Sequence, residues 1–335
     1  KQPPRHECNH KDLPLGKEGG GIIRLNVGNS EQVVSFEDQI KGHIEFRAGL
    51  LGDFSVARTV TDPLYNFAAV VDDAEMEISH VIRGEDHISN TPKQILIYEA
   101  LGKTPPLFAH LPLILAPDRT KLSKRHGAMA VVDYKKDYLP EAVVNFLGGL
   151  GYTFSKDILS REEMIQEFEL SKIHKSGAIF DTKKLNWINC QYIRRLTPAE
   201  FKNLTNLNIS NSAVPLVTER LEKLSDAQEF SYLWSEPIYE KELLNWKDTE
   251  WHITQESLER ALGVIENWDF QDSEILKHRL DVVAGDNRGM VYWPLRVALS
   301  GKEKSPDPVQ LVVVLGKNEV VKRVKKAIGK TEFNS

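Results

Sequence analysis

The sequence is poor in cysteine and has no long apolar run, and each shortage excludes a class of protein. Its 335 residues include only two cysteines, Cys8 and Cys190, which lie far apart. Two such cysteines give no disulfide framework, and they are typical of a protein from a reducing cytoplasm. No stretch approaches 18 uninterrupted apolar residues, so no membrane-spanning helix is expected.

The chain also lacks a large excess of charge of one sign. Its 43 basic and 48 acidic residues give a net charge of −5 at pH 7. This balance argues against a protein that coats nucleic acid over its whole surface, but it allows local basic patches. With 41% apolar and 27% charged residues, the chain has the composition of a folded globular protein. Its length is enough for two to four compact units.

The start of the chain lacks an initiator methionine and any secretory pattern. Residues 1–20 have the composition of a loop from the middle of a domain, so we expect an upstream portion to be missing. His6, Cys8 and His10 lie in this stretch and raise the possibility of zinc. A structural zinc site needs four ligands in paired clusters, and no partner cluster follows downstream. We therefore predict no metal site, while leaving open one that is completed by upstream ligands.

The apolar pattern divides the chain into an α/β part and an all-α part. Residues 21–60 alternate in the manner of strands. Residues 78–84, 92–101 and 108–117 then predict a strand, a helix and a strand, with Thr91 as the helix N-cap and polar clusters at one sheet edge. From about residue 139 to the end, apolar residues recur at helical spacing behind capping-box starts.

A basic loop, "DRTKLSKRHG" at residues 118–127, follows the last predicted strand. A solvated surface turn is the plain interpretation of such a cluster. Lysines on a mobile loop are also suited to following phosphate charge that moves during a reaction. Lys121 to Arg125, "KLSKR", resembles the "KMSKS" loop of class I aminoacyl-tRNA synthetases, in the form typical of the glutamyl enzymes.

The sequence around this loop extends the resemblance to nearly the whole chain. Residues 64–102 are similar to the second half of the glutamyl-tRNA synthetase catalytic domain, and residues 185–196 and 288–324 resemble later parts of the same family. The resemblance implies a partial nucleotide-binding (Rossmann-like) α/β catalytic domain followed by an all-α tRNA- and anticodon-binding region. The implied domains are residues 1–64 (end of an inserted acceptor-binding region), 65–130 (catalytic), 131–200 (stem-contact) and 201–335 (anticodon-binding).

The resemblance also implies roles for individual residues. Lys124, and second to it Lys121, would stabilise charge on ATP as catalytic residues. The residues implied in ATP binding are Lys121, Leu122, Ser123, Lys124, Arg125, Asp86 and Ile114. Arg83 and Tyr65 would bind the substrate glutamate, with arginine supplying a fork for a carboxylate; the alternative for Arg83 is a structural ion pair with Asp72, Asp73 or Glu85.

Basic residues of the all-α part are candidates for contacts with RNA. The resemblance favours contacts between the RNA backbone and Lys183, Lys184, Arg194 and Arg195. The sequence alone indicates equally well an amphipathic helix whose charged residues lie in water. In the last helix we expect Val320, Val324 and Ile328 inside. Its basic residues Lys322, Arg323, Lys325 and Lys326 are expected in solvent, where they could add to an RNA footprint.

Two positions depart from the family pattern. Residues 61–63, Thr-Asp-Pro, lack the glycine that often precedes the family's tyrosine, and His87 stands where some relatives have tryptophan. The family's "HIGH"-like ATP signature is also absent from the sequence, so we expect this chain to form no adenylate by itself.

The function implied is that of a glutamate–tRNA ligase, a cytoplasmic and monomeric enzyme of translation. It would use ATP with Mg²⁺ to activate L-glutamate and transfer it to tRNA(Glu). Two alternatives remain. One is a non-catalytic tRNA-binding fragment or module, and the other is a glutaminyl-type enzyme, against which the all-α C-terminal part argues.

Overall fold

The computed structural model describes residues 21–28, 31–123, 125, 130–247, 249–269 and 271–332. They form two compact units, each built from two stretches of sequence. The first unit takes Lys1–Met129 and Val144–Thr182, and the second takes Ala130–Val143 and Lys183–Ser335. Within the described residues no helix is both long and apolar enough to cross a membrane.

A four-stranded sheet is the centre of the first unit. Its strands are β2 (Val33–Asp38), β3 (Gly42–Arg47), β6 (His80–Gly84) and β7 (Leu107–Leu111), in the order β3-β2-β7-β6. β3 is antiparallel to β2, whereas β2, β7 and β6 are parallel to one another. The carboxyl ends of these three strands therefore lie at one edge of the sheet, which we call the carboxyl edge.

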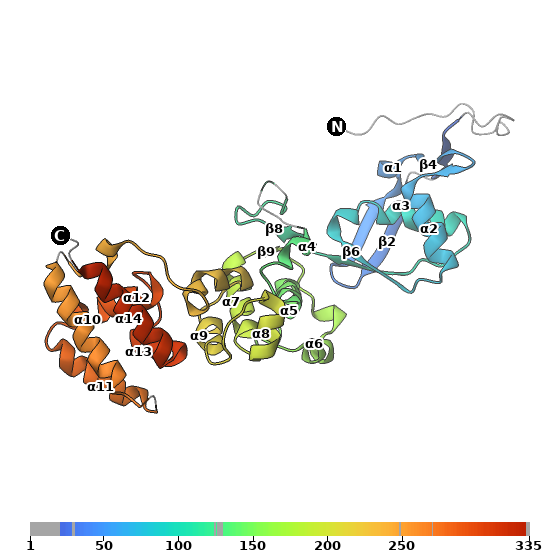
Figure 1. The fold of residues 1–335 in the computed structure, drawn as a ribbon. Coiled ribbons are helices and arrows are strands. Elements are labelled where there is room, and N and C mark those ends of the chain that lie inside the picture. Colours follow the sequence, from blue (N-terminus) through green and yellow to red (C-terminus); the bar gives the residue numbers. More distant parts are fainter. Residues whose placement is uncertain are drawn as a thin grey trace. The chain divides into compact units, whose positions relative to one another are not determined.

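Two helices, α2 (Tyr65–Glu75) and α3 (Thr91–Ala100), accompany this sheet (Figure 1). α3 connects β6 to β7, so the predicted strand, helix and strand are confirmed. Side chains of α3 and the sheet share one apolar core, including Ile95, Ile97 and Phe108. The N-cap prediction was one residue off: α3 begins at Thr91, and Asn90 precedes it.

The remaining strands of the first unit form two small sheets. β1 (Ile23–Leu25), β4 (Phe54–Thr59) and β5 (Asp62–Pro63) pair in the order β1-β4-β5, and the short α1 (Ala48–Leu51) precedes β4. The predicted strand at 108–117 is in fact two strands. Its second part, β8 (Ile114–Leu115), leaves the main sheet and pairs in parallel with β9 (Ala178–Ile179). The end of α5 (Pro140–Gly151), α6 (Arg161–Glu167) and the 3-10 turns η1 (Glu85–His87) and η3 (Leu170–Lys172) complete the described elements.

The second unit is helical. The prediction of an all-α part from about residue 139 is confirmed except at β9, and residues 144–182 of that part belong to the first unit. Its described elements are α4 (Val131–Tyr134), the start of α5 (Pro140–Gly151), α7 (Thr182–Ile193), α8 (Pro198–Thr205), α9 (Val214–Thr218), η4 (Leu224–Leu233), η5 (Lys241–Leu244), α10 (Trp251–Glu266), α11 (Ser273–Ala284), α12 (Gly289–Ser300), α13 (Pro308–Leu315) and α14 (Lys317–Thr331). α10 to α14 gather into one bundle (Figure 1, orange to red). Capping boxes open α6 at Ser160 and α8 at Thr197, which is the predicted pattern.

The prediction for the last helix was wrong at one residue. Val320 and Val324 of α14 are buried as expected and Ile328 is half-buried, but Arg323 is also buried, with 3% of its surface exposed. Its guanidinium donates to the carbonyls of Tyr232, Leu299 and Ser235 and pairs with Glu319. These carbonyls lie at or just beyond the ends of η4 and α12, where backbone oxygens lack helical partners. Arg323 therefore satisfies helix ends and does not face solvent.

Candidate active site at the carboxyl edge

Arg83 lies in β6, one residue before the carboxyl end of the strand, and its guanidinium donates hydrogen bonds to three side chains. Its Nε donates to Nε2 of His110 at 3.2 Å. Its Nη2 donates to Thr91 Oγ1 and Gln94 Oε1, both at 2.8 Å and both in α3. Three of the five N–H donors of the guanidinium are thus engaged, and the two on Nη1 lie outside these contacts.

The predicted partner of Arg83, Tyr65, lies beside it. Burial lowers the pKa of the Arg83 guanidinium, and the nearby Tyr65 hydroxyl opposes this lowering. Tyr65 is the first residue of α2 and is 56% exposed. Its hydroxyl is 3.4 Å from Nδ1 of His87, and the two rings are 5.8 Å apart. The structure therefore brings together the two residues predicted to bind glutamate, and adds His87 to their surroundings.

The alternative for Arg83, a structural ion pair, does not occur among the residues that the structure describes. Glu85 instead pairs with Lys41 and accepts the backbone N–H of Leu113 at 3.0 Å. Burial raises the pKa of Glu85, but these two contacts outweigh it, and the pKa lies below the usual value. Asp73 acts on Arg83 only as a charge at longer range.

Two residues predicted to bind ATP contact each other. Asp86, in η1, accepts a hydrogen bond from Lys121 Nζ at 3.0 Å, and both side chains are exposed. This bond lowers the pKa of Asp86. An exposed pair of this kind is weak and exchanges readily with water, so either partner can turn to another charged group.

The basic loop is attached to β8. Leu122 donates its N–H to the carbonyl of Ile114 at 2.9 Å, and Lys121 forms a bridge with Leu115. Ser123 is half-buried and Arg125 is exposed, while Lys124 lies outside the described residues. The loop thus folds back on the strand that the resemblance links to adenine.

Gly177 allows β9 to support this strand. A Cβ at this position would lie 2.6 Å from the carbonyl oxygen of Leu113 and 3.0 Å from the side chain of Leu115. Real Cβ atoms essentially never approach a backbone atom that closely. The close pairing of β9 with β8 therefore requires glycine here.

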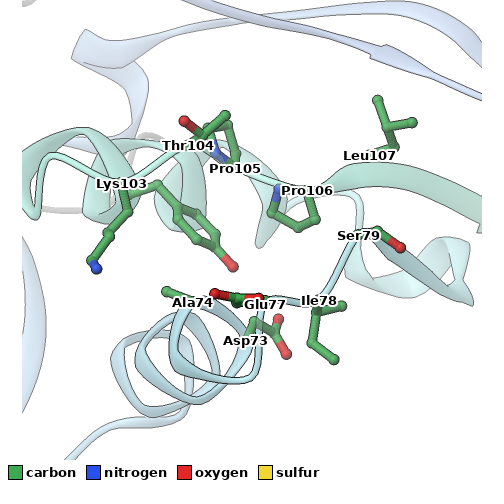
Figure 2. A pocket seen from close by; sticks show the side chains of 11 residues that line it. Asp73, Ala74, Glu77, Ile78, Ser79, Lys103, Thr104, Pro105, Pro106 and Leu107 are labelled. Atoms are coloured by element: carbon green, nitrogen blue, oxygen red, sulfur yellow. The ribbon is translucent and has the colours of Figure 1, made fainter.

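A separate pocket of about 360 Å³ lies at the opposite, amino edge of the sheet. Figure 2 shows Asp73 and Glu77 on one side of it and Thr104, Pro105 and Pro106 on the other. Its lining includes the residues that precede or begin β6 and β7, Ser79 and Leu107, and none of the predicted site residues. This hollow and the arginine site are at opposite ends of the same strands.

The predicted RNA contacts lie on the outside of α7 and just beyond it. Leu185, Ile188 and Ile193 are buried, whereas Lys183, Lys184, Arg194 and Arg195 are all exposed. Arg194 also donates to the carbonyl of Glu219, and Arg195 stacks over Tyr192. Trp187 is exposed on the same helix. The amphipathic pattern is confirmed, and a role in RNA binding stays a prediction.

His6, Cys8 and His10, the residues that raised a zinc site, lie outside the described residues. The part of the chain that the structure does describe contains no cluster of three or more His, Cys, Asp or Glu side chains suited to a metal.

Comparison with known proteins decides the family. Residues 7–187 match the family model for the catalytic domain of class I tRNA synthetases (E and Q), and residues 182–328 match an anticodon-binding domain. The glutamate–tRNA ligase of Dehalococcoides mccartyi (strain CBDB1) is 35% identical over 98% of this chain and 72% of its own length. That of Francisella tularensis (strain SCHU S4) is 40% identical over 94% of this chain and 71% of its own. The chain belongs to the glutamate–tRNA ligase family.

A solved structure from the same family has a closely similar fold. The glutamate tRNA ligase of Elizabethkingia meningosepticum, crystallised in complex with its amino acid, has a TM-score of 0.77 and 30% identity. The match covers 93% of this chain and 68% of that one. The predicted class I α/β domain followed by a helical anticodon-binding region is therefore confirmed.

Family resemblance did not indicate the residues that surround Arg83. Asp38, His110, Thr91 and Gln94 come from β2, β7 and α3, and all are buried. One signal was present in the sequence: His110 interrupts an otherwise apolar strand, and a buried histidine needs partners for both ring nitrogens. The identity of those partners depends on strand pairing, which the sequence pattern does not reveal.

Proposed function

We propose that this protein acts as a glutamate–tRNA ligase. It activates L-glutamate with ATP to give glutamyl-adenylate and pyrophosphate, and then transfers the glutamyl group to the 3′ end of tRNA(Glu). The observation that carries the proposal is an arginine fixed beside a tyrosine at the carboxyl edge of parallel strands. Ligands of open α/β sheets bind at that edge.

Each group of residues has a distinct part in this reaction. Arg83 and Tyr65 bind glutamate, with Arg83 directing Nη1 at a carboxylate. Asp86, Ile114, Lys121, Leu122, Ser123, Lys124 and Arg125 bind ATP, which carries Mg²⁺ as its counter-ion. The α-carboxylate of glutamate attacks the α-phosphorus and pyrophosphate leaves. A ribose hydroxyl of tRNA then attacks the adenylate carbonyl, and AMP leaves. Positioning and charge stabilisation are sufficient for these steps, so no covalent nucleophile is required.

The helical part holds the tRNA in this proposal. Lys183, Lys184, Arg194 and Arg195 contact its phosphates, and they lie at the start of the stretch, residues 182–328, that matches the anticodon-binding domain. The divisions at residues 64/65, 130/131 and 200/201 are part of the proposal, as are a monomeric state and a place in the cytoplasm beside the translation machinery.

The first experiment tests the reaction and its amino acid. The full-length protein is incubated with ATP, tRNA and either labelled glutamate or labelled glutamine. Charging with glutamate is the expected result. Charging with glutamine alone would move the protein to the glutaminyl type, and charging with neither would favour a non-catalytic RNA-binding protein.

A second experiment tests the loop. Lys124→Ala should slow pyrophosphate exchange by roughly 30-fold or more, the effect of removing one group that stabilises transition-state charge. Its tRNA affinity should be unchanged, because the loop acts on phosphate transfer. Lys103→Ala, an exposed lysine at the amino edge of the sheet, is the matched control. Exchange within threefold of wild type would remove Lys124 from the catalytic role.

A third experiment measures RNA binding by the 335-residue chain. Its tRNA affinity should fall steeply as salt rises, since the proposed contacts are made to phosphates. Arg195→Gln should reduce the slope of log K against log salt by about 0.7–0.9, which is one phosphate contact. The control is Lys172→Gln, an exposed lysine of the first unit that pairs with Glu169. An unchanged slope for Arg195→Gln would leave that arginine as a surface residue.

A further inference from the structure

Three neighbouring parallel strands each contribute one charged or titratable side chain to a continuous chain of hydrogen bonds. Asp38 ends β2, His110 is the residue before the end of β7, and Arg83 is the residue before the end of β6. Asp38 Oδ2 lies 2.6 Å from His110 Nδ1, and His110 Nε2 lies 3.2 Å from Arg83 Nε. Asp38 is 4% exposed and His110 is fully buried.

The contacts determine which atoms of Asp38 and His110 carry a proton. Burial raises the pKa of Asp38, but hydrogen bonds from the backbone N–H groups of Lys41 and Ile40 and from His110 outweigh it and hold the pKa below the usual value. Burial lowers the pKa of His110, which the Asp38 carboxylate only partly offsets. A charged Asp38 therefore faces a neutral His110, so Nδ1 carries the proton and Nε2 presents its lone pair to Arg83.

His110 and Thr91 together present two acceptors to the edge of the Arg83 guanidinium formed by Nε and Nη2. Its Nε2 and Thr91 Oγ1 are 3.1 Å apart, and they accept from Nε and Nη2 of Arg83 respectively. Gln94 takes the second Nη2 hydrogen. A guanidinium engaged at these three donors has one orientation. In that orientation Nη1 lies outside these contacts, and the Tyr65 hydroxyl, the other predicted glutamate ligand, is a hydrogen-bond partner of the same guanidinium.

We propose that Asp38 and His110 are positioning residues for the substrate carboxylate: Asp38 selects the His110 tautomer that accepts from Arg83, and this orients Nη1. The proposal rests on the proposed function only for the identity of the ligand. The opposite tautomer, or the imidazolium, would direct an N–H at the N–H of Arg83 and expel the guanidinium from this orientation.

Asp38→Asn is designed to change the tautomer of His110 while keeping the other contacts of residue 38. Asparagine has nearly the shape of aspartate, and its oxygen can still accept the N–H groups of Ile40 and Lys41. Its amide, however, donates to His110 Nδ1 and forces the proton to Nε2. The same change inverts the histidine tautomer in the serine-protease triad. Glu37→Gln, at the preceding exposed position of β2, is the matched control.

The first measurement needs no activity and uses the 335-residue chain. A long-range proton–nitrogen NMR spectrum distinguishes protonated from bare ring nitrogens, and the His110 signals among the ten histidines are assigned by their loss in His110→Gln. Wild type and Glu37→Gln should show the proton on Nδ1 at pH 7.5, and Asp38→Asn should show it on Nε2. A wild-type proton on Nε2, or a doubly protonated ring, would overturn the proposal.

The second measurement uses the full-length protein. Asp38→Asn should raise the KM for glutamate by roughly ten- to hundredfold, by analogy with the carboxylates that orient metal-bound histidines. The KM for ATP and the affinity for tRNA should stay within twofold of wild type. An unchanged glutamate KM in Asp38→Asn together with a raised one in Arg83→Ala would refute positioning and leave the glutamate site intact. No change in Arg83→Ala would refute the proposed glutamate site itself.

A second pair of variants covers the case in which Asp38→Asn does not fold. His110→Gln keeps an oxygen that can accept from Arg83, whereas His110→Phe keeps the ring beside Phe108 but offers no acceptor. Glutamate KM should rise at least fivefold more in His110→Phe than in His110→Gln. Equal values in the two folded variants would refute the role of the acceptor.

Discussion

Replacing Arg323 with methionine should destabilise the second unit while leaving its RNA-binding surface unchanged. Methionine fills similar space but removes the donors to Tyr232, Leu299 and Ser235. The contacts to Tyr232 and Leu299 are buried, and a buried carbonyl left without a partner costs about 1–3 kcal/mol, whereas the carbonyl of the exposed Ser235 can bond to water. The expected loss is therefore roughly 3–5 kcal/mol. Glu319 is partly exposed and can be solvated again, so its unpaired charge adds little.

The distribution of tryptophan makes this loss measurable for the second unit alone. All six tryptophans of the chain lie between Trp187 and Trp293, within that unit. Urea unfolding followed by tryptophan fluorescence therefore reports on it selectively. A loss of 3–5 kcal/mol should also lower the thermal midpoint by about 10 °C. Such a loss is a large share of the 5–15 kcal/mol of stability typical of a domain.

A control on the same helix separates this effect from the loss of any surface charge. Lys325, two residues further along α14, is exposed and pairs with Glu266 at 2.9 Å. Lys325→Met should cost less than about 1 kcal/mol. At a temperature where both variants are folded, Arg323→Met should bind tRNA as wild type does. A stability loss below 1 kcal/mol, or weaker tRNA binding by a fully folded variant, would refute the structural role of Arg323.

Three more predictions concern the first unit. Arg83→Lys should raise the KM for glutamate about 10- to 150-fold in a charging assay, because losing a charge-assisted hydrogen bond costs about 1.5–3 kcal/mol; a KM within twofold would return Arg83 to a structural role. Gly177→Ala should displace β9 from β8 and raise the KM for ATP, whereas Gly149→Ala, which has open space around it, should not. The free energy of unfolding, followed by circular dichroism, should fall as pH drops below about 6.5, because the lowered pKa of His110 means that the unfolded chain binds the proton first. His110→Gln should remove this dependence, and an equal slope in both proteins would contradict it.

The sequence predicted those features that depend on local pattern or on family motifs. Helical spacing and capping boxes predicted the all-α part, and the "HVIRG" strand with its following polar cluster placed Arg83 at a strand end. The adjacency of Tyr65 and Arg83 followed from the family resemblance. In each case the deciding residues lie close together in the sequence or match a known motif.

Features that depend on distant segments were not predicted. Asp38 reaches His110 because β2 pairs with β7, and a period-two pattern does not identify a strand's neighbour. The basic face of α14 predicts an exposed Arg323. The carbonyls that bury it belong to η4 and α12, far away in the sequence. A buried polar residue thus depends on partners that only the folded chain defines.

The interleaving of the two units has a consequence for the order in which the protein matures during synthesis. Residues 130–143 leave the ribosome before β9 does, yet they belong to the second unit, where Leu139 and Asp137 bond to Asn189. β8, which carries the basic loop, must wait for β9 before it gains its partner strand. The nascent chain therefore carries parts of both units that still lack their packing partners. When residue 182 has emerged, all residues of the first unit are available, but most of the second unit is not yet synthesised. The unit that is proposed to bind ATP and glutamate is therefore expected to complete its folding before the unit that is proposed to bind tRNA.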